Sequence, residues 1–121
     1  MPMSVARARR LAELVKEEMG QILQRMLKDP RIGFVSVTDV EVSADLAHIK
    51  IYLSPYGDAE AKHQTMMGLE SARGFIRSEL GQRLRLRHTP EIELIADDSI
   101  ERGARIMSLL EEIKRDQRDE S

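Results

Sequence analysis

Five arginines and a single glutamate fall between Ser71 and Pro90, in the stretch SARGFIRSELGQRLRLRHTP. The basic residues are Arg73, Arg77, Arg83, Arg85 and Arg87. A guanidinium group donates two parallel hydrogen bonds in one plane, which matches the oxygens of a phosphate. The stretch therefore favours binding to phosphate groups, such as those of a nucleic-acid backbone. A solvated helix face with no ligand remains the alternative reading of such a cluster.

The distribution of charge along the chain supports a local basic surface, although the net charge is only −2. Residues 1–31 carry seven basic and four acidic side chains, whereas residues 91–121 carry five basic and ten acidic ones. Phosphate contacts depend on local patches rather than on the total charge. A second candidate patch lies near the N-terminus, with weaker candidates before the first strand: Arg7, Arg9 and Arg10, then Lys28 and Arg31.

No catalytic or metal-binding pattern accompanies these arginines. The three histidines lie in separate segments, and none has the i, i+4 spacing with a carboxylate that a metal site uses. The chain has no cysteine, which excludes disulfides and thiolate ligands, and it has no glycine-rich nucleotide loop. An enzyme that acts on RNA ends, with Asp45 as its carboxylate, is the least favoured alternative. We expect no enzyme, no cofactor and no small-molecule substrate.

Hydrophobic periodicity predicts the elements that position the arginines. A first helix, capped by Ser4, ends before Asp29-Pro30, because the residue before a proline avoids helical geometry. Two β-branched segments, 34–42 and 47–53, predict an antiparallel hairpin. The apolar parity changes inside the first segment, which indicates a bulge near Thr38 and Asp39.

The second half of the chain is predicted as two helices, a strand and a last helix. Helical spacing runs from about residue 59 to Thr89-Pro90, and a third strand begins near residue 91. The order α-β-β-α-α-β-α indicates a single α+β domain with its helices on one face of a small sheet. We expect residues 1–114 to form this domain and residues 115–121 to be a disordered charged tail.

A glycine interrupts the long helical stretch, at a cost of roughly 0.5–1 kcal/mol relative to alanine. We expect a joint between two helices at Ala72, Arg73 and Gly74, with the glycine allowing the chain to turn. A KH domain clamps RNA at a GxxG loop between two helices, but this chain has no GxxG. An RNA-recognition sheet that stacks bases is disfavoured, because there are only two Phe, two Tyr and no Trp.

Three stretches resemble the bacterial ribosome-binding factor A family, over roughly residues 4–114: KDPRIGFVSVTDVEVSADLAHIKIYLS, SARGFIRSELGQRLRLRHTPEIEL and DDSIERGARI. The resemblance implies a type II KH-like fold in which an Ala-x-Gly kink replaces the GxxG loop. It also implies a non-enzymatic factor that binds the small (30S) ribosomal subunit and 16S rRNA and assists late maturation, including the 16S 5′ end. Members often carry a longer charged tail than this chain has.

A protein-interaction module that binds a ribosomal protein or an assembly GTPase is the alternative function, with the arginines serving solubility. The acidic segment 91–121 could serve such a contact. No apolar run approaches the length of a membrane span, and no targeting segment is visible, so the expected compartment is the cytoplasm. We expect a monomer, because no large apolar stripe is left over in this assignment of faces.

Overall fold

The computed structural model describes residues 2–25 and 28–120, and the side chains of residues 5–25, 28–99, 103 and 105–115. Its elements, in chain order, are α1 (Pro2–Arg25), β1 (Val35–Val42), β2 (His48–Pro55), α2 (Ala59–Ser71), α3 (Arg73–Arg83), β3 (Glu91–Ala96) and α4 (Ser99–Glu120). This order confirms the predicted α+β, KH-like architecture with an added C-terminal helix.

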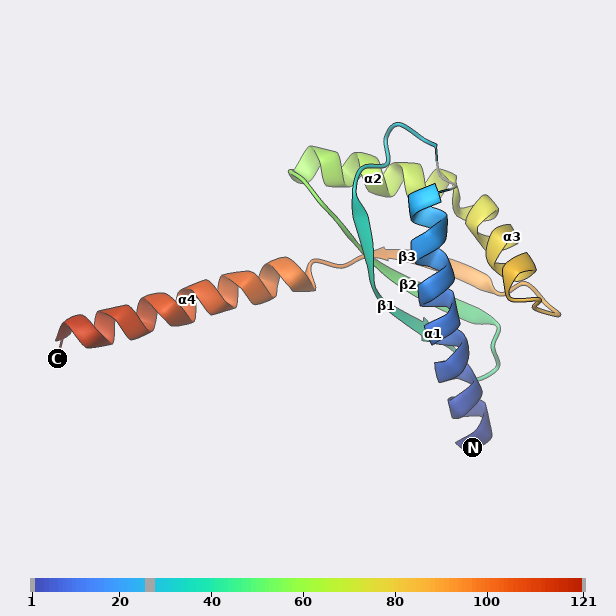
Figure 1. Cartoon of the computed structure of the whole chain (residues 1–121), viewed down its shortest axis with the longest axis horizontal. Coiled ribbons are helices and arrows are strands. Elements are labelled where there is room, and N and C mark those ends of the chain that lie inside the picture. The colour runs from blue at the N-terminus through green and yellow to red at the C-terminus, as the bar shows by residue number, and fades with distance from the viewer. Residues whose placement is uncertain (1, 26–27, 121) are drawn as a thin grey trace.

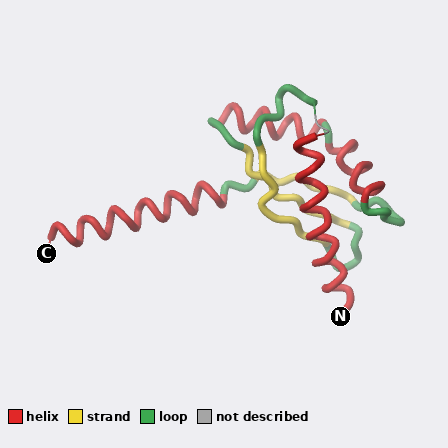
Figure 2. The backbone as a smooth tube through the Cα atoms, viewed as in Figure 1, coloured by secondary structure: helices red, strands yellow, loops and turns green. Residues whose placement is uncertain are grey.

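The sheet has the strand order β1-β2-β3. β1 pairs with β2 in antiparallel fashion, and β2 pairs with β3 in parallel fashion. A parallel neighbour requires a crossover, which α2 and α3 supply. Figure 1 shows α1, α2 and α3 gathered around the sheet, whereas α4 projects away from it, and Figure 2 shows the short loop that joins the sheet to α4.

The hydrophobic core lies between the sheet and the three packed helices. Its fully buried side chains come from α1, β2, α2 and α3: Val15, Met19, Ile22, Ile49, Ile51, Leu53, Leu69, Ile76 and Leu80. The inward residues of β2 alternate with exposed or half-buried ones, because only one face of the sheet carries helices. The apolar periodicity in the sequence therefore identified most of this core, although it also included Leu14, which is 42% exposed.

The predicted bulge is confirmed in β1. The register with β2 shifts between Val37 and Asp39, so that Thr38 is the extra residue. Its hydroxyl donates to Asp97 at 2.7 Å, which ties the bulge to the segment after β3. Because the bulge restores the alternation, Val37 and Val40 both face the helices despite their odd spacing.

The DPRIG segment before β1 is a clamp on the end of α2. Asp29 accepts hydrogen bonds from the Arg31 backbone N–H at 2.9 Å and from its guanidinium at 2.6 Å. Arg31 also donates to the Ser71 hydroxyl at 3.1 Å, and the Gly33 N–H donates to Thr65 Oγ1 at 3.1 Å. The hydrogen bonds from Arg31 lower the pKa of the Asp29 carboxyl to about 2.

This clamp predicts a loss of stability in acid. A carboxyl whose folded pKa is lowered stabilises the fold above its ordinary pKa near 3.8, and that stabilisation is lost as the pH falls towards about 2. Asp29→Asn should therefore unfold at lower urea concentration than the wild type at pH 7, and the difference should shrink between pH 4 and pH 2. Equal urea midpoints at pH 7 would show that the clamp does not stabilise the domain.

Two sequence expectations need correction, and a third stays a prediction. α1 begins at Pro2 rather than after a cap at Ser4, and proline is well tolerated in the first turn of a helix. α3 ends at Arg83 rather than near Thr89, so Arg83 and Arg87 do not share a helix face. α4 continues to Glu120, through the segment expected to be a tail, and the division at residue 114 stays a prediction.

The large apolar residues that the structure describes on α4 are not part of the core. Five large side chains on this helix are 48–60% exposed: Ile106, Met107, Leu109, Leu110 and Ile113. The expected monomer rested on the premise that no apolar stripe is left exposed. The exposed apolar side chains of α4 show that this premise is wrong. The monomeric state itself stays a prediction.

Candidate nucleic-acid interface

The two helices of the predicted kink meet at Ala72. Its backbone, at φ −89° and ψ 1°, breaks the helix between Ser71 and Arg73. Its N–H donates to the carbonyls of Gly68 and Leu69 in α2, and its carbonyl accepts from Ile76 in α3. The chain therefore turns at the alanine, and Gly74 lies in the first turn of α3.

Gly74 is not required by the turn, contrary to the sequence expectation. Its φ lies outside the left-handed region, and a Cβ added to it would meet nothing within 4 Å. The glycine instead lines an open hollow of about 540 Å³, whose other lining residues are Arg77, Ser78, Arg87, His88 and Thr89. A missing side chain at this place lets a ligand approach the backbone of α3 closely.

Arg73 and Arg77 face β3 from neighbouring turns of α3. Arg77 donates to the carbonyls of Pro90 at 2.8 Å and Thr89 at 2.9 Å, and it pairs with Glu91 at 3.2 Å. Arg73 pairs with Glu70 at 2.9 Å and remains about half exposed. Arg77 therefore fixes the loop before β3, and this loop forms one wall of the hollow.

Arg83 joins two helices that are far apart in the sequence. Its guanidinium bonds Glu18 of α1 at 2.9 Å and Glu79 of α3 at 3.3 Å. These hydrogen bonds raise the pKa of Arg83, and its side chain is only 25% exposed. The position favours a structural contact between α1 and α3 over a free phosphate ligand.

Arg85 and Arg87 are exposed, and no ion pair or side-chain hydrogen bond joins either of them to the described residues. Arg85 has φ 51°, in the left-handed region. The hydrogen bonds from Leu86 N–H to Gly81 O and from Arg85 N–H to Gln82 O form a Schellman motif, in which glycine is the usual residue at this position. An arginine occupies a backbone position that glycine would fill with less strain.

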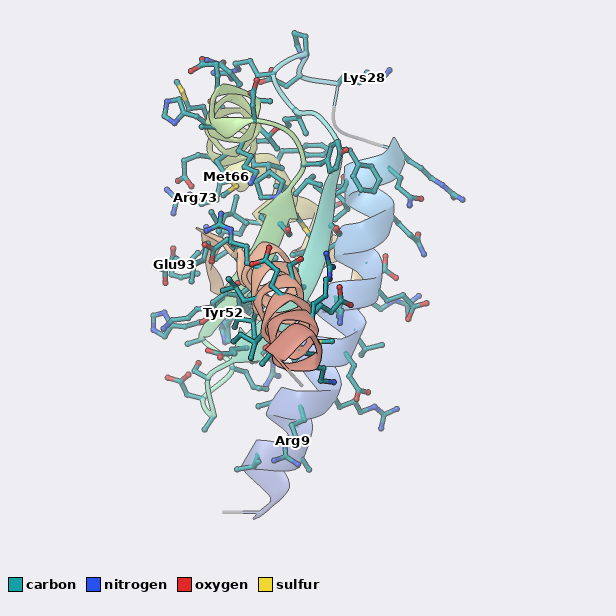
Figure 3. The ribbon with its side chains drawn as sticks, turned by 90° about the vertical axis from the view of Figure 1, so that its left-hand side faces the viewer. Arg9, Lys28, Tyr52, Met66, Arg73 and Glu93 are labelled. Atoms are coloured by element: carbon teal, nitrogen blue, oxygen red, sulfur yellow. The ribbon has the colours of Figure 1, made fainter. Side chains whose placement is uncertain are left out.

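The remaining basic candidates do not join this hollow. Arg7, Arg9 and Arg10 are exposed along the first turns of α1, and Lys28 is exposed just beyond its other end. Figure 3 shows Arg9 and Lys28 at opposite ends of α1 and Arg73 on the other side of the molecule. The structure thus distributes the predicted residues over three places, and Arg31 is engaged in the clamp with Asp29.

Sequence reasoning missed His88, Ser78 and Thr89 as lining residues of the hollow. The sequence pattern predicts only a surface position for His88. Its position next to Arg87, a predicted binding residue, is the feature from which a place in the site could have been inferred. Within the part of the chain that the structure describes, no cluster of three metal-binding side chains occurs. No described helix is long and apolar enough to cross a membrane.

These features define the class of the protein as a small KH-like α+β domain in which a basic surface beside an alanine turn stands in place of the glycine loop. The chain belongs to the ribosome-binding factor A family, because residues 7–110 match the family described as Ribosome-binding factor A. This is a family of non-enzymatic assembly factors.

Close relatives carry the same description. The Ribosome-binding factor A of Halothermothrix orenii is 54% identical over 111 residues, which cover 92% of this chain and 91% of that protein. The Ribosome-binding factor A of Trichormus variabilis is 56% identical over 110 residues, which cover 89% of this chain and 83% of that protein.

Solved structures support the fold. The crystal structure of ribosome-binding factor A from Thermus thermophilus matches with a TM-score of 0.63 at 24% identity, over 74% of this chain and 94% of that one. A homology model of the Thermus thermophilus factor, fitted into an electron-microscopy map of its 30S complex, has a TM-score of 0.58 at 24% identity, over 69% of this chain and 88% of that one.

Proposed function

We propose that this protein binds the free or immature small (30S) ribosomal subunit through 16S rRNA in the cytoplasm, and assists late maturation, including processing of the 16S 5′ end. The observation that carries the proposal is the pair of exposed guanidinium groups of Arg85 and Arg87, which no ion pair or side-chain hydrogen bond joins to the described residues. Arg87 also lines the Gly74 hollow. The family assignment and the 30S complex of the Thermus factor support it.

Contacts of this kind position a protein on RNA without reading its sequence, because phosphates are the same at every nucleotide. The specificity of this proposed function would come from the shape of a large, rigid RNA. Arg73, at the rim of the turn, and the α1 patch of Arg7, Arg9 and Arg10 are proposed as additional phosphate ligands.

Sucrose-gradient co-sedimentation tests the proposal. The protein should travel with free small subunits and with precursor particles, and less with assembled ribosomes. Cells that lack the protein should accumulate 16S precursors with extended 5′ ends, which the wild-type chain corrects. Absence from every ribosomal particle would rule out the function, and normal 5′ ends would rule out the processing role alone.

Arg85→Gly gives a prediction in which stability and binding move in opposite directions. Removal of the Cβ from a left-handed position should stabilise the fold by about 0.5–1 kcal/mol, since the strain relieved exceeds the entropy cost of glycine. Loss of the guanidinium should weaken small-subunit binding about tenfold. Urea unfolding and sedimentation titration measure the two effects. Unchanged binding in the stabilised variant would remove Arg85 from the interface.

One observation favours the alternative function, a protein-interaction module. The apolar residues of α4 are exposed and lie away from the sheet (Figure 1). An exposed apolar helix face is typical of a surface that docks on another protein. Binding measured on naked 16S rRNA fragments, with and without ribosomal proteins, separates the two: the alternative predicts binding only when proteins are present.

A further inference from the structure

We infer that a second hollow, between α1 and the start of β1, is a stacking site for one unpaired nucleobase of RNA. This inference rests on the proposed function, and it adds a site that lies outside the arginine cluster. The hollow has a volume of about 560 Å³. A volume of this size falls within the range of small-ligand sites in proteins.

One exposed aromatic ring lines this hollow, and a second exposed ring contacts the first. Phe34 lines it, and its ring contacts Tyr56 edge to face, with centroids 6.5 Å apart and planes at 82°. Both residues are 75% exposed, although aromatic side chains are usually buried for their apolar area. An edge-to-face contact occupies at most one face of one ring, so a planar base can stack on a face that stays open.

Hydrogen bonds fix the backbone that carries the aromatic pair. The Tyr56 N–H donates to the Phe34 carbonyl at 2.9 Å, which extends the β1–β2 ladder by one pair beyond Val35 and Pro55. Gly33, next to Phe34, is held by Thr65 on α2. The backbone that carries the rings therefore needs little ordering when a base binds, which lowers the entropic cost of binding.

The floor of the hollow is a row along α1. Lys16, Gly20 and Gln24 follow at i, i+4 and i+8, so they lie one above the other on one side of the helix and all line the hollow. A Cβ added to Gly20 would meet nothing within 4 Å, so packing does not require this glycine in the middle of a 24-residue helix. As at Gly74, the missing side chain opens a surface.

The polar groups of this row suit a nucleotide. Lys16 is exposed, and no ion pair joins its ammonium to the described residues, so it can neutralise a phosphate. Gln24, two turns and about 12 Å along the helix, offers an amide donor and acceptor for a base edge. The hollow thus offers a cation for a phosphate, an aromatic face for a base and an amide for a base edge. Single-stranded RNA is bound by combinations of this kind.

Tyrosine fluorescence provides the test. The chain has two tyrosines and no tryptophan, so in Tyr52→Phe the emission comes from Tyr56 alone. The probes are a ten-nucleotide single-stranded oligoadenylate and an RNA duplex of equal length. We expect the single strand, and not the duplex, to quench Tyr56.

Two variants alter the site at positions where the fold does not depend on the side chain, since Phe34 is 75% exposed and a Cβ at Gly20 meets nothing within 4 Å. Phe34→Leu should weaken oligoadenylate binding about 5- to 100-fold, whereas Phe34→Tyr should bind as the wild type does. Because Phe34→Tyr adds a tyrosine, the affinities of the Phe34 variants are measured by the fluorescence anisotropy of a dye-labelled oligoadenylate. Gly20→Leu fills the floor and favours the helix, so it should fold well and lose binding to a similar extent. Met67→Ala, which trims another exposed apolar side chain on α2, is the matched control and should bind as the wild type does.

Small-subunit sedimentation of the same variants separates the outcomes. If both hollow variants bind oligoadenylate and subunits normally, the stacking site is overturned while the proposed function stands. A second outcome is that both variants bind oligoadenylate and naked 16S rRNA normally but no longer sediment with small subunits, which also contain ribosomal proteins. In that case the hollow takes a protein side chain and the inference is overturned. If the wild type quenches with oligoadenylate but sediments with no subunit, the proposed function fails and the stacking site remains supported.

Discussion

Reversal of charge at both Arg85 and Arg87 to glutamate should lower the affinity for free small subunits by at least about 100-fold at physiological salt. Each guanidinium is expected to donate charge-assisted hydrogen bonds to phosphate, which contribute about 1.5–3 kcal/mol apiece. Each lost phosphate contact should also reduce the slope of log affinity against log salt by about one. Sedimentation titration at several salt concentrations measures both quantities.

The fold should survive this double reversal, because both side chains are exposed and no ion pair or side-chain hydrogen bond within the described residues depends on them. Arg77 is not part of the variant, since its guanidinium holds the Thr89 and Pro90 carbonyls. Arg105→Glu with Arg115→Glu on α4 changes the net charge equally at exposed positions and serves as the control. If the control lost as much affinity, general charge rather than this site would explain the binding.

Gly68→Ala should destabilise the domain by about 1–3 kcal/mol, which lowers the melting temperature by about 4–12 °C. A Cβ at this position would lie 2.6 Å from Cγ1 of Ile32 and 3.4 Å from Cβ of Arg31. Both contacts belong to the DPRIG segment, which Asp29 and Thr65 hold in place. The segment therefore cannot move aside without breaking its own hydrogen bonds.

Gly74→Ala is the matched control for this prediction, because the two glycines lie six residues apart in neighbouring helices. Its Cβ meets nothing, so the substitution should stabilise the fold by about 0.5–1 kcal/mol. Calorimetry on both variants measures the difference. Equal melting temperatures would mean that α2 and the DPRIG segment are not in close contact in solution. Weaker subunit binding by the stabilised Gly74→Ala variant would assign that glycine to RNA contact.

The sequence predicted that the helical stretch is broken, but not the residue at which it breaks. The glycine in the stretch correctly indicated an interruption, but the interruption falls at Ala72, two residues earlier. Helix propensity identifies a weak residue, whereas the point of turning depends on how Leu69 and Ile76 are both buried against the sheet. The break therefore lies at Ala72, where both helices can bury their apolar residues in one core.

Period-two and period-3.6 patterns by themselves determined the order of elements, the bulge at Thr38 and nearly all of the buried core. These are properties of neighbours along the chain, so they can be read locally. The same patterns placed α4 with the other amphipathic helices, although its described large apolar side chains are 48–60% exposed. Whether an apolar face finds a partner depends on geometry beyond the helix itself.

Only the tertiary structure determined which arginines have a bonding partner for their guanidinium group. The guanidinium of Arg83 bonds Glu18, 65 residues away in the sequence, and that of Arg77 donates to the carbonyls before β3. No ion pair or side-chain hydrogen bond joins the guanidinium of Arg85 or Arg87 to the described residues. The aromatic pair of Phe34 and Tyr56 likewise forms because β1 and β2 are paired. An ionic or aromatic contact requires two groups within a few ångströms, and for residues far apart in the chain only the folded backbone sets that distance.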